Sequence, residues 1–274
     1  MRDLFNLDSK TIIITGATGL LGTKHVEAVA EFGAIPIVLD IDQKKIDQLV
    51  NRIRSEYDVA CYGYFTDVTN EIEVRDVCQT IAKKLGKIDC LINNAANNPK
   101  IEDSDNINFT RLENFKLETW NTDVAVGLTG AFLCAKHFGS EIAKNPSGGT
   151  IINISSDLGL ISPDQRLYRN DFVENHLQNT KPVSYSVVKS GLLGLTKYLA
   201  TYWADANVRC NAICPGGIMN NQDEDFLKRL HNLIPLGRMA KQDEYKGIIV
   251  FLASNAAAYV NGAVISIDGG RTVW

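Results

Sequence analysis

The chain has 274 residues, of which 45% are hydrophobic and 22% charged, and its length and composition can bury a full core, which argues against disorder. Its formal net charge of −4 and dispersed basic residues argue against nucleic acid or an anionic membrane as a partner. No apolar run approaches the roughly 18 residues of a membrane helix and the first residues lack the plan of a signal peptide, so we expect a cytoplasmic protein.

Apolar, β-branched runs alternate with helical patterns along the chain. The runs at 11–15, 35–40, 63–68, 89–95, 149–156, 208–216 and 263–270 predict seven strands. Such alternation is typical of a mostly parallel sheet with helices on both faces. No linker or internal repeat divides the sequence, so we expect one doubly wound α/β domain of the Rossmann type over 1–274. Its ligand should lie outside the carboxyl ends of the strands.

A glycine-rich turn, TGATGLLG, follows the first predicted strand and opens a helix. Glycines at such a turn let the chain bend tightly and let a phosphate approach the amides at the positive end of the helix. We therefore expect a dinucleotide to contact this turn through Gly16, Thr18, Gly19, Leu20, Leu21 and Gly22.

Asp40 ends the second predicted strand, and Ile41 follows it. A carboxylate at this place accepts hydrogen bonds from both hydroxyls of an adenosine ribose and repels a phosphorylated ribose. The sequence therefore favours NAD over NADP as the cofactor. The alternative is that Asp40 only caps the turn that follows.

The cysteines and histidines do not form a metal-binding pattern. None of the six cysteines belongs to a Cys-x-x-Cys pair or has a histidine at metal spacing, so we expect reduced, buried thiols and no metal. They are Cys61, Cys78, Cys90, Cys134, Cys210 and Cys214.

Tyr185 and Lys189 lie four residues apart in SYSVVKSGLLGLTKYLA, a segment that predicts a helix with both side chains on one face. A cation within about 6 Å favours a phenolate and lowers the pKa of a tyrosine. Such a tyrosine can act as an acid or a base near neutral pH. The spacing alone is a weak signal, because it also arises by chance in many helices.

Taken together, the motifs resemble the short-chain dehydrogenase/reductase family, from about residue 5 to the end, in its compact single-domain branch. The matching pieces are TGATGLLG, Asp40, Asp67-Val68, NNAA at 93–96, IINISSDLG at 151–159, YSVVK at 185–189, PGGI at 215–218 and GAVISIDGG at 262–270. The insert between the serines and the tyrosine also resembles bacterial members that act in surface-sugar biosynthesis.

The resemblance implies catalytic roles for Ser156, Tyr185 and Lys189. Tyr185 would remove a proton from an alcohol or return one to a carbonyl oxygen, and Lys189 would hold the nicotinamide ribose. Ser155 should point away from the reaction. The cofactor-binding residues implied further along the chain are Asp67, Val68, Asn94, Ala95, Ala96, Pro215, Gly216, Gly217 and Ile218.

Two departures from the family pattern concern glycines. The spacing of the glycine-rich turn puts Leu20 where a glycine is common, which is also the pattern of the longer nucleotide-sugar epimerases and dehydratases; the terminal IDGG favours the compact branch. Gly127 stands where the family generally places a catalytic asparagine that holds a water beside the lysine. Asp123, one helical turn earlier, either holds such a water or faces solvent.

Three long segments, at about 96–119, 158–183 and 217–240, should form substrate loops at the carboxyl edge of the sheet. We expect Asp157, Arg166 and Arg169 to contact the substrate, and the basic residues suit a polar, anionic ligand. A solvated surface loop is the alternative.

These observations favour an NAD(H)-dependent oxidoreductase that interconverts a secondary alcohol and a ketone on a sugar phosphate or nucleotide sugar, in surface-glycan biosynthesis. The alternatives are a 3-oxoacyl-carrier-protein reductase and a catalytically silent nucleotide-binding regulator. The resemblance also implies a homodimer or homotetramer.

Overall fold

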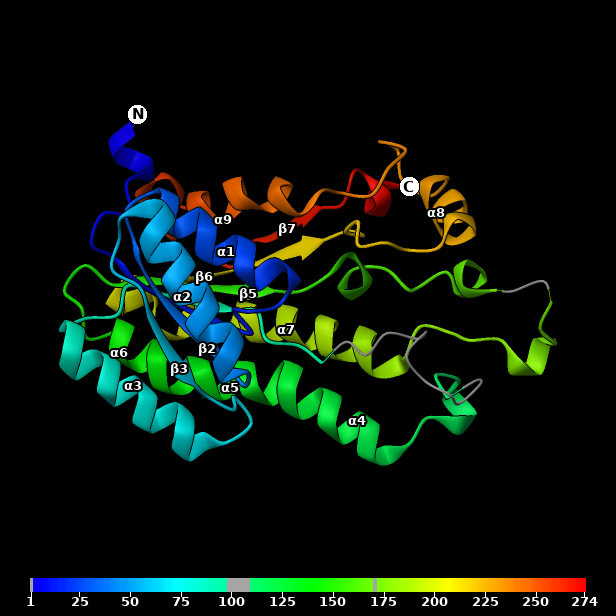
Figure 1. The fold of residues 1–274 in the computed structure, drawn as a ribbon, viewed down its shortest axis with the longest axis horizontal. Helices are drawn as coiled ribbons and strands as arrows, with labels where there is room; N and C mark the ends of the chain where they lie inside the picture. Colours follow the sequence, from blue (N-terminus) through cyan, green and yellow to red (C-terminus); the bar gives the residue numbers. More distant parts are fainter. Residues whose placement is uncertain (1, 98–108, 170–171) are drawn as a thin grey trace.

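The computed structural model describes residues 2–97, 109–169 and 172–274, and its strands form one parallel sheet (Figure 1). The order across the sheet is β3-β2-β1-β4-β5-β6-β7. The strands are β1 (Thr11–Thr15), β2 (Ile35–Asp40), β3 (Tyr62–Phe65), β4 (Cys90–Asn93), β5 (Gly149–Ile154), β6 (Val208–Pro215) and β7 (Val264–Ile267). The predicted seven-stranded parallel sheet is confirmed.

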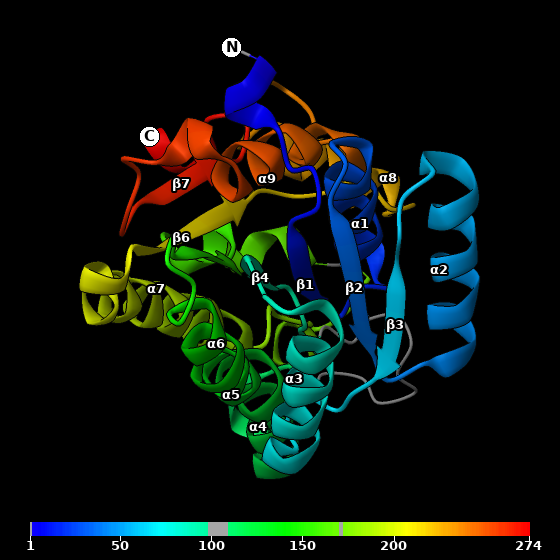
Figure 2. The ribbon, with the colours of Figure 1, turned by 90° about the vertical axis from the view of Figure 1, so that its left-hand side faces the viewer.

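Helices cover both faces of the sheet (Figure 2). One face carries α1 (Leu20–Glu31), α2 (Gln43–Tyr57) and α9 (Lys246–Ala253). The other carries α3 (Glu71–Leu85), α4 (Leu117–Val124), α5 (Gly130–Cys134), α6 (Ser140–Ile142) and α7 (Val183–Tyr202). The short helix α8 (Glu224–His231) lies beyond the carboxyl end of β6 (Figure 1).

The alternation of side chains along each strand divides the core into two layers. In β1, Ile12 and Ile14 pack with α1 and α9, whereas Ile13 packs with α3 and α5. Successive strand residues point to opposite faces, so a strand buried on both sides must be apolar at nearly every position. This requirement explains the continuous run TIIIT, all of it buried.

The helices on the second face contain two π-helical turns, Ala125–Thr129 between α4 and α5 and Ala135–Gly139 between α5 and α6. Such turns often occur at functional sites within otherwise regular helices. The first of them contains Gly127, and it lies against α7.

The cysteines are all free and buried, as the sequence predicts. Burial raises the pKa of Cys61 to about 12, because the thiolate loses its hydration. Within the described residues, no helix is both long and apolar enough to cross a membrane.

The order of the strands reverses between β1 and β4, which lie side by side although β2 and β3 come between them in the sequence. The connections after β1 and after β4 therefore leave the sheet on opposite faces. Ligands of open parallel sheets bind at the carboxyl edge beside such a reversal.

Candidate active site

A cleft of about 960 Å³ lies at the carboxyl edge of the sheet, over the reversal of strand order. Its walls come from the loops after β1, β2, β3, β4, β5 and β6 and from α7. Of the predicted cofactor-binding residues, those lining the cleft are Gly16, Thr18, Gly19, Leu20, Leu21, Asp40, Ile41, Asp67, Val68, Asn94, Ala95, Ala96, Tyr185, Lys189, Pro215, Gly216 and Ile218.

Two predicted cofactor-binding glycines lie outside this lining. A Cβ atom on Gly22 would come within 2.2 Å of the Gly16 carbonyl oxygen, so Gly22 lets α1 pack against its own loop. Gly217 lines a neighbouring cavity of about 230 Å³ that also contains Arg238 and Tyr245. Gly22 therefore supports the loop behind the cleft, and Gly217 lies beside the cleft.

The loop before α1 is built to accept an anion. Gly16 has a φ of +58°, and a Cβ atom there would lie 2.8 Å from the Cα of Ala95, so a larger residue would strain the turn. Gly19 caps the helix without any side-chain hydrogen bond, which leaves the first amides of α1 directed at the cleft. This cradle fits the pyrophosphate of a dinucleotide.

The Asp40 side chain is held at the end of β2 by two backbone amides. Thr18 N donates to Asp40 Oδ2 at 2.9 Å, and Ile41 N donates to Oδ1 at 2.8 Å. These bonds fix the carboxylate beside the glycine-rich loop, where Asp40 lines the cleft. The only cation among the residues that line the cleft nearby, Lys45, is paired with Asp42 at 3.1 Å.

The opposite wall of the cofactor end is supported by Asn94. Its side-chain amide donates to the carbonyl oxygens of Thr15 and Gly16, at 3.0 Å each, and its backbone amide donates to Thr15 Oγ1 at 3.0 Å. Asn94 thereby ties the loop after β4 to the glycine-rich loop. Three hydrogen bonds therefore hold the two loops together at the edge of the cleft.

Tyr185 and Lys189 lie one turn apart on α7, beside the carboxyl end of β5. The Lys189 ammonium is buried and donates to the Ile154 carbonyl oxygen at 2.8 Å, and it lies 5.8 Å from the centroid of the Tyr185 ring. Burial, and after it the charge of the neighbouring Lys181, lower the pKa of Lys189 to about 8. The predicted one-face arrangement of the two side chains is present.

The expectation that a cation lowers the pKa of Tyr185 is wrong for this structure. Burial raises the pKa of the Tyr185 phenol; a hydrogen bond with Ser156 opposes the shift and the Asp157 charge adds to it. The loss of hydration of the phenolate therefore outweighs the hydrogen bond with Ser156, while the Lys189 ammonium donates to the backbone.

Lys181, one of the basic residues of the predicted substrate loop, is a second cation at this tyrosine, a position that the sequence analysis did not assign to it. Its ammonium lies 3.8 Å from the centroid of the Tyr185 ring, over the ring face. Burial lowers the pKa of Lys181 to about 8, against the attraction of Asp157 and Asp123. The available signal was its position four residues before Tyr185, but Pro182 separates it from the helix.

Asp123 points into the protein rather than to solvent. It is 7% exposed, Asn97 Nδ2 donates to its Oδ1 at 2.7 Å, and the Ser184 hydroxyl donates to its Oδ2. Together with Gly127 and Lys189, these residues line a cavity of about 20 Å³. A polar cavity needs roughly 10–15 Å³ to hold one water.

Gly127 is required by close packing between the π-helical turn and α7. A Cβ atom on Gly127 would lie 2.5 Å from Val188 Cγ1, whereas a Cβ atom on Gly247 in α9 would meet nothing within 4 Å. We expect Gly127→Ala to lower the free energy of unfolding by about 1–3 kcal/mol. Gly247→Ala, the matched control, should raise it by about 1 kcal/mol. Denaturant unfolding measures both; equal effects would contradict the packing argument.

The predicted serines point in different directions. Ser155 Oγ donates to the Lys189 carbonyl oxygen at 2.7 Å, so its hydroxyl is committed to the backbone of α7. Ser156 Oγ donates to Asp157 Oδ1 at 2.8 Å and contacts Tyr185. The structure thus brings Ser156, Tyr185 and Lys189 together.

The three predicted substrate residues lie in different environments. Asp157 is 3% exposed and pairs with Arg271. Arg166 is exposed and pairs with Asp164 of its own loop at 2.7 Å, and Arg169 is exposed as well. Neither arginine lines the cleft or the small cavity beside Lys189. Of the predicted substrate loops, residues 98–108 and 170–171 lie outside the described residues.

Comparison with known proteins adds sequence evidence to this geometry. Residues 10–168 match the short chain dehydrogenase model, and residues 171–272 match the enoyl-(acyl carrier protein) reductase model. The chain is 31% identical to an NADP-dependent mannitol dehydrogenase of Alternaria alternata, covering 100% of this chain and 96% of the relative. It is 30% identical to a 3-oxoacyl-[acyl-carrier-protein] reductase of Thermotoga maritima, covering 97% and 99%.

A solved structure has the same fold throughout. A gluconate 5-dehydrogenase from Burkholderia cenocepacia J2315, in complex with NADP and tartrate, superimposes with a TM-score of 0.84 at 26% identity, covering 100% of this chain and 99% of the other. The chain described here therefore belongs to the short-chain dehydrogenase family and is an oxidoreductase of the NAD(P)-dependent type.

Proposed function

We propose that the protein is an NAD(H)-dependent oxidoreductase that interconverts a secondary alcohol and a ketone on a polyhydroxylated substrate. The observation that carries the proposal is that Tyr185 and Lys189 line one end of a cleft that starts at the glycine-rich loop, with Ser156 in contact with Tyr185. When bound, the nicotinamide ring supplies or accepts the hydride.

The residues of this chain would supply the proton chemistry. In alcohol oxidation, Tyr185 accepts the hydroxyl proton as the hydride leaves the same carbon, and in ketone reduction it returns a proton to the carbonyl oxygen. Lys189, buried beside the phenol, stabilises the phenolate while it exists. Ser156 Oγ, at the end of β5, accepts a hydrogen bond from the reacting hydroxyl, because its own proton is donated to Asp157.

The preference for NAD over NADP rests on the charges at the adenosine end. Both oxygens of Asp40 are fixed by backbone amides and leave lone pairs for ribose hydroxyls. A 2′-phosphate would meet this carboxylate, and Lys45 is engaged by Asp42. The named relatives that use NADP do not decide the matter for this chain, because the choice depends on these few side chains.

We expect the dissociation constant for NAD to be at least about tenfold lower than that for NADP, corresponding to about 1.4 kcal/mol. Asp40→Ala should narrow the ratio, because it removes both the ribose acceptor and the repulsion of the phosphate. Calorimetric titration with each cofactor measures the two constants. Asp47→Ala, which removes an exposed carboxylate of α2 outside the cleft, is the control for charge alone. An NADP affinity equal to that of NAD in the wild type would contradict the assignment.

The substrate is proposed to be polar and to carry several hydroxyls, as a sugar phosphate or nucleotide sugar of surface-glycan biosynthesis does. Lys181 lies over the tyrosine at the reacting end, and Arg166 and Arg169 are exposed on the adjoining loop. Similar proteins named for mannitol and gluconate support a polyol-like substrate.

The test is nicotinamide absorbance with a panel of mannitol, gluconate, sugar phosphates and nucleotide sugars. Turnover with at least one of them, lost in Tyr185→Phe, is the expected result. A 3-oxoacyl-carrier-protein substrate is the second candidate, favoured by the similarity to the Thermotoga maritima reductase, and an acyl thioester belongs in the panel for that reason. Cofactor binding without turnover on any compound would indicate a nucleotide-binding regulator.

Self-association through the outer faces of α5 and α7 is also proposed. Large apolar side chains are exposed there, which supports a dimer or tetramer formed by these helices. They are Phe132, Val187, Tyr198 and Tyr202.

A further inference from the structure

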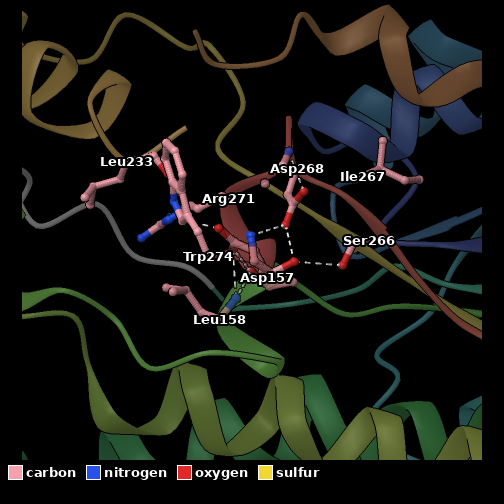
Figure 3. Close-up of polar contacts among 12 residues, drawn as sticks. Asp157, Leu158, Leu233, Ser266, Ile267, Asp268, Arg271 and Trp274 are labelled. Carbon is pink, nitrogen blue, oxygen red and sulfur yellow. Dashed lines mark hydrogen bonds and ion pairs between the residues drawn. The ribbon is translucent and has the colours of Figure 1, made fainter. Parts of the chain in front are cut away.

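A buried ion pair joins the serine loop to the end of the chain. Arg271 Nη1 lies 2.8 Å from Asp157 Oδ2, and the side chains are 8% and 5% exposed. Asp157 begins the short helix η6 (Asp157–Gly159) directly after Ser156, and Arg271 begins η12 (Arg271–Val273) after β7. Figure 3 shows the two side chains meeting beside the turn that follows β7.

The second oxygen of Asp157 determines where the Ser156 proton lies. Ser156 Oγ donates to Asp157 Oδ1 at 2.8 Å and accepts from Leu158 N at 3.2 Å. An ion-paired carboxylate accepts hydrogen bonds and has none to donate. The single hydroxyl proton of Ser156 therefore points to Asp157, and its oxygen remains an acceptor for the Tyr185 phenol or a substrate hydroxyl.

The turn after β7 holds Arg271 in a defined position. Asp268 accepts hydrogen bonds from Gly270 N at 2.9 Å, Thr272 N at 3.0 Å and Thr272 Oγ1 at 2.6 Å (Figure 3). Trp274 Nε1 donates to the Leu233 carbonyl oxygen at 3.3 Å, which attaches the end of the chain to the segment after α8. The hydrogen bonds of its own turn thus hold Arg271 in place.

Asp157 places a negative charge close to the proposed catalytic tyrosine. After burial, its charge is one of the causes that raise the pKa of Tyr185. Further titratable groups interact with this pair from the neighbouring elements, namely Asp164, Tyr168, Lys181, Cys214 and Tyr245. Lys189 and Asp268 also lie on the elements that surround the pair.

We propose that Arg271 and Asp157 are positioning residues that set the pH at which Tyr185 gives up its proton. Asp157 accepts the hydrogen bond of Ser156, and Arg271 neutralises the charge of the Asp157 carboxylate. The proposal rests on the proposed role of Tyr185. Its physical basis is that a lone buried charge acts strongly on a neighbouring group, whereas a close ion pair acts weakly because its two fields largely cancel.

The two single variants should move the tyrosine in opposite directions. Arg271→Gln leaves an unbalanced carboxylate, which disfavours the phenolate, so the ionisation midpoint of Tyr185 should rise by about 1 pH unit. Asp157→Asn leaves an unbalanced guanidinium, which favours the phenolate, so the midpoint should fall by about 1 pH unit. The double variant removes both charges and should return close to the wild type, as should Arg271→Lys, which keeps the charge.

The measurement is the near-ultraviolet absorbance of tyrosinate in the NAD-bound protein as a function of pH, taken as the difference between each variant and the same variant with Tyr185→Phe. This readout needs no substrate, and it does not report the ionisation of the neighbouring lysines. Where the panel supplies an alcohol, the pH profile of kcat for its oxidation should shift in the same two directions.

Arg52→Gln is the control for general destabilisation, because it breaks another partly buried ion pair, with Glu27 at 2.9 Å on α1. It should lower the unfolding temperature without moving the tyrosine midpoint. Because an unpaired buried charge can prevent folding, the double variant, which leaves none, keeps the test usable.

Shifts of the same sign in both single variants, or no shift in either, would overturn the proposal. A double variant displaced as far as a single one would do the same. If these shifts fail while Tyr185→Phe still abolishes turnover, only the role of Arg271 and Asp157 is lost. If Tyr185→Phe remains active, the proposed function itself is wrong.

Discussion

Tyr185→Phe is expected to lower kcat by about a hundredfold to ten-thousandfold, which is the usual contribution of a positioned acid or base. The ring is retained, so its packing against Lys181 and the shape of the cleft should be unchanged, and only the proton donor is lost. The dissociation constant for the cofactor should therefore stay within about twofold of the wild-type value. Steady-state kinetics and calorimetric titration provide the two numbers.

Lys189→Ala, unlike Tyr185→Phe, should change both kcat and the dissociation constant for the cofactor. The ammonium lies between β5 and Tyr185 and lines the cofactor cleft, so its removal weakens cofactor binding as well as turnover. Lys197→Ala, on the exposed side of the same helix, is the matched control. Most of the wild-type activity surviving in Tyr185→Phe would show that the assigned mechanism is wrong.

Asp123→Asn is expected to lower kcat by about tenfold, with a smaller effect on stability, because a water in the cavity beside Gly127 would link Lys189 to the Asp123 carboxylate. An amide at this position can still accept from Asn97 and can donate to Ser184, so the packing is kept and the proton-accepting charge is lost. The effect is measured as kcat at a series of pH values, in water and in deuterium oxide, since a proton-transfer step is slower in deuterium oxide.

Asp123→Ala distinguishes the proton path from the structural role of this carboxylate. It leaves the Ser184 hydroxyl and the Asn97 amide without their partner, at a cost of about 1–3 kcal/mol in the free energy of unfolding. If the rate and the pH profile are unchanged in both variants, Asp123 is a structural residue and solvent alone carries the proton.

Local signals in the sequence determine the order of strands and helices and the position of the cofactor loop. The run TIIIT is buried on both faces, and the glycines that follow it are needed for a tight turn and a close approach, at Gly16 against Ala95 and at Gly22 against the loop backbone. Each of these features depends on neighbours a few residues away or on a parallel sheet that its apolar runs already imply.

The register of Tyr185 and Lys189 on one helix is also a local property, since it follows from 3.6 residues per turn. The pKa of Tyr185 is not a local property, because it depends on how much water the fold removes from the phenol. That is why the expected lowering of its pKa became a rise in the folded protein.

Only the tertiary structure decided which polar side chains meet. The inward orientation of Asp123 depends on Ser184, 61 residues later, and Asp157 meets Arg271 across 114 residues. No periodicity relates residues so far apart, and the same carboxylates would read as surface groups in an exposed helix or loop. Their partners follow from which loops leave the same edge of the sheet and how closely the helices pack there, as at Gly127 against Val188.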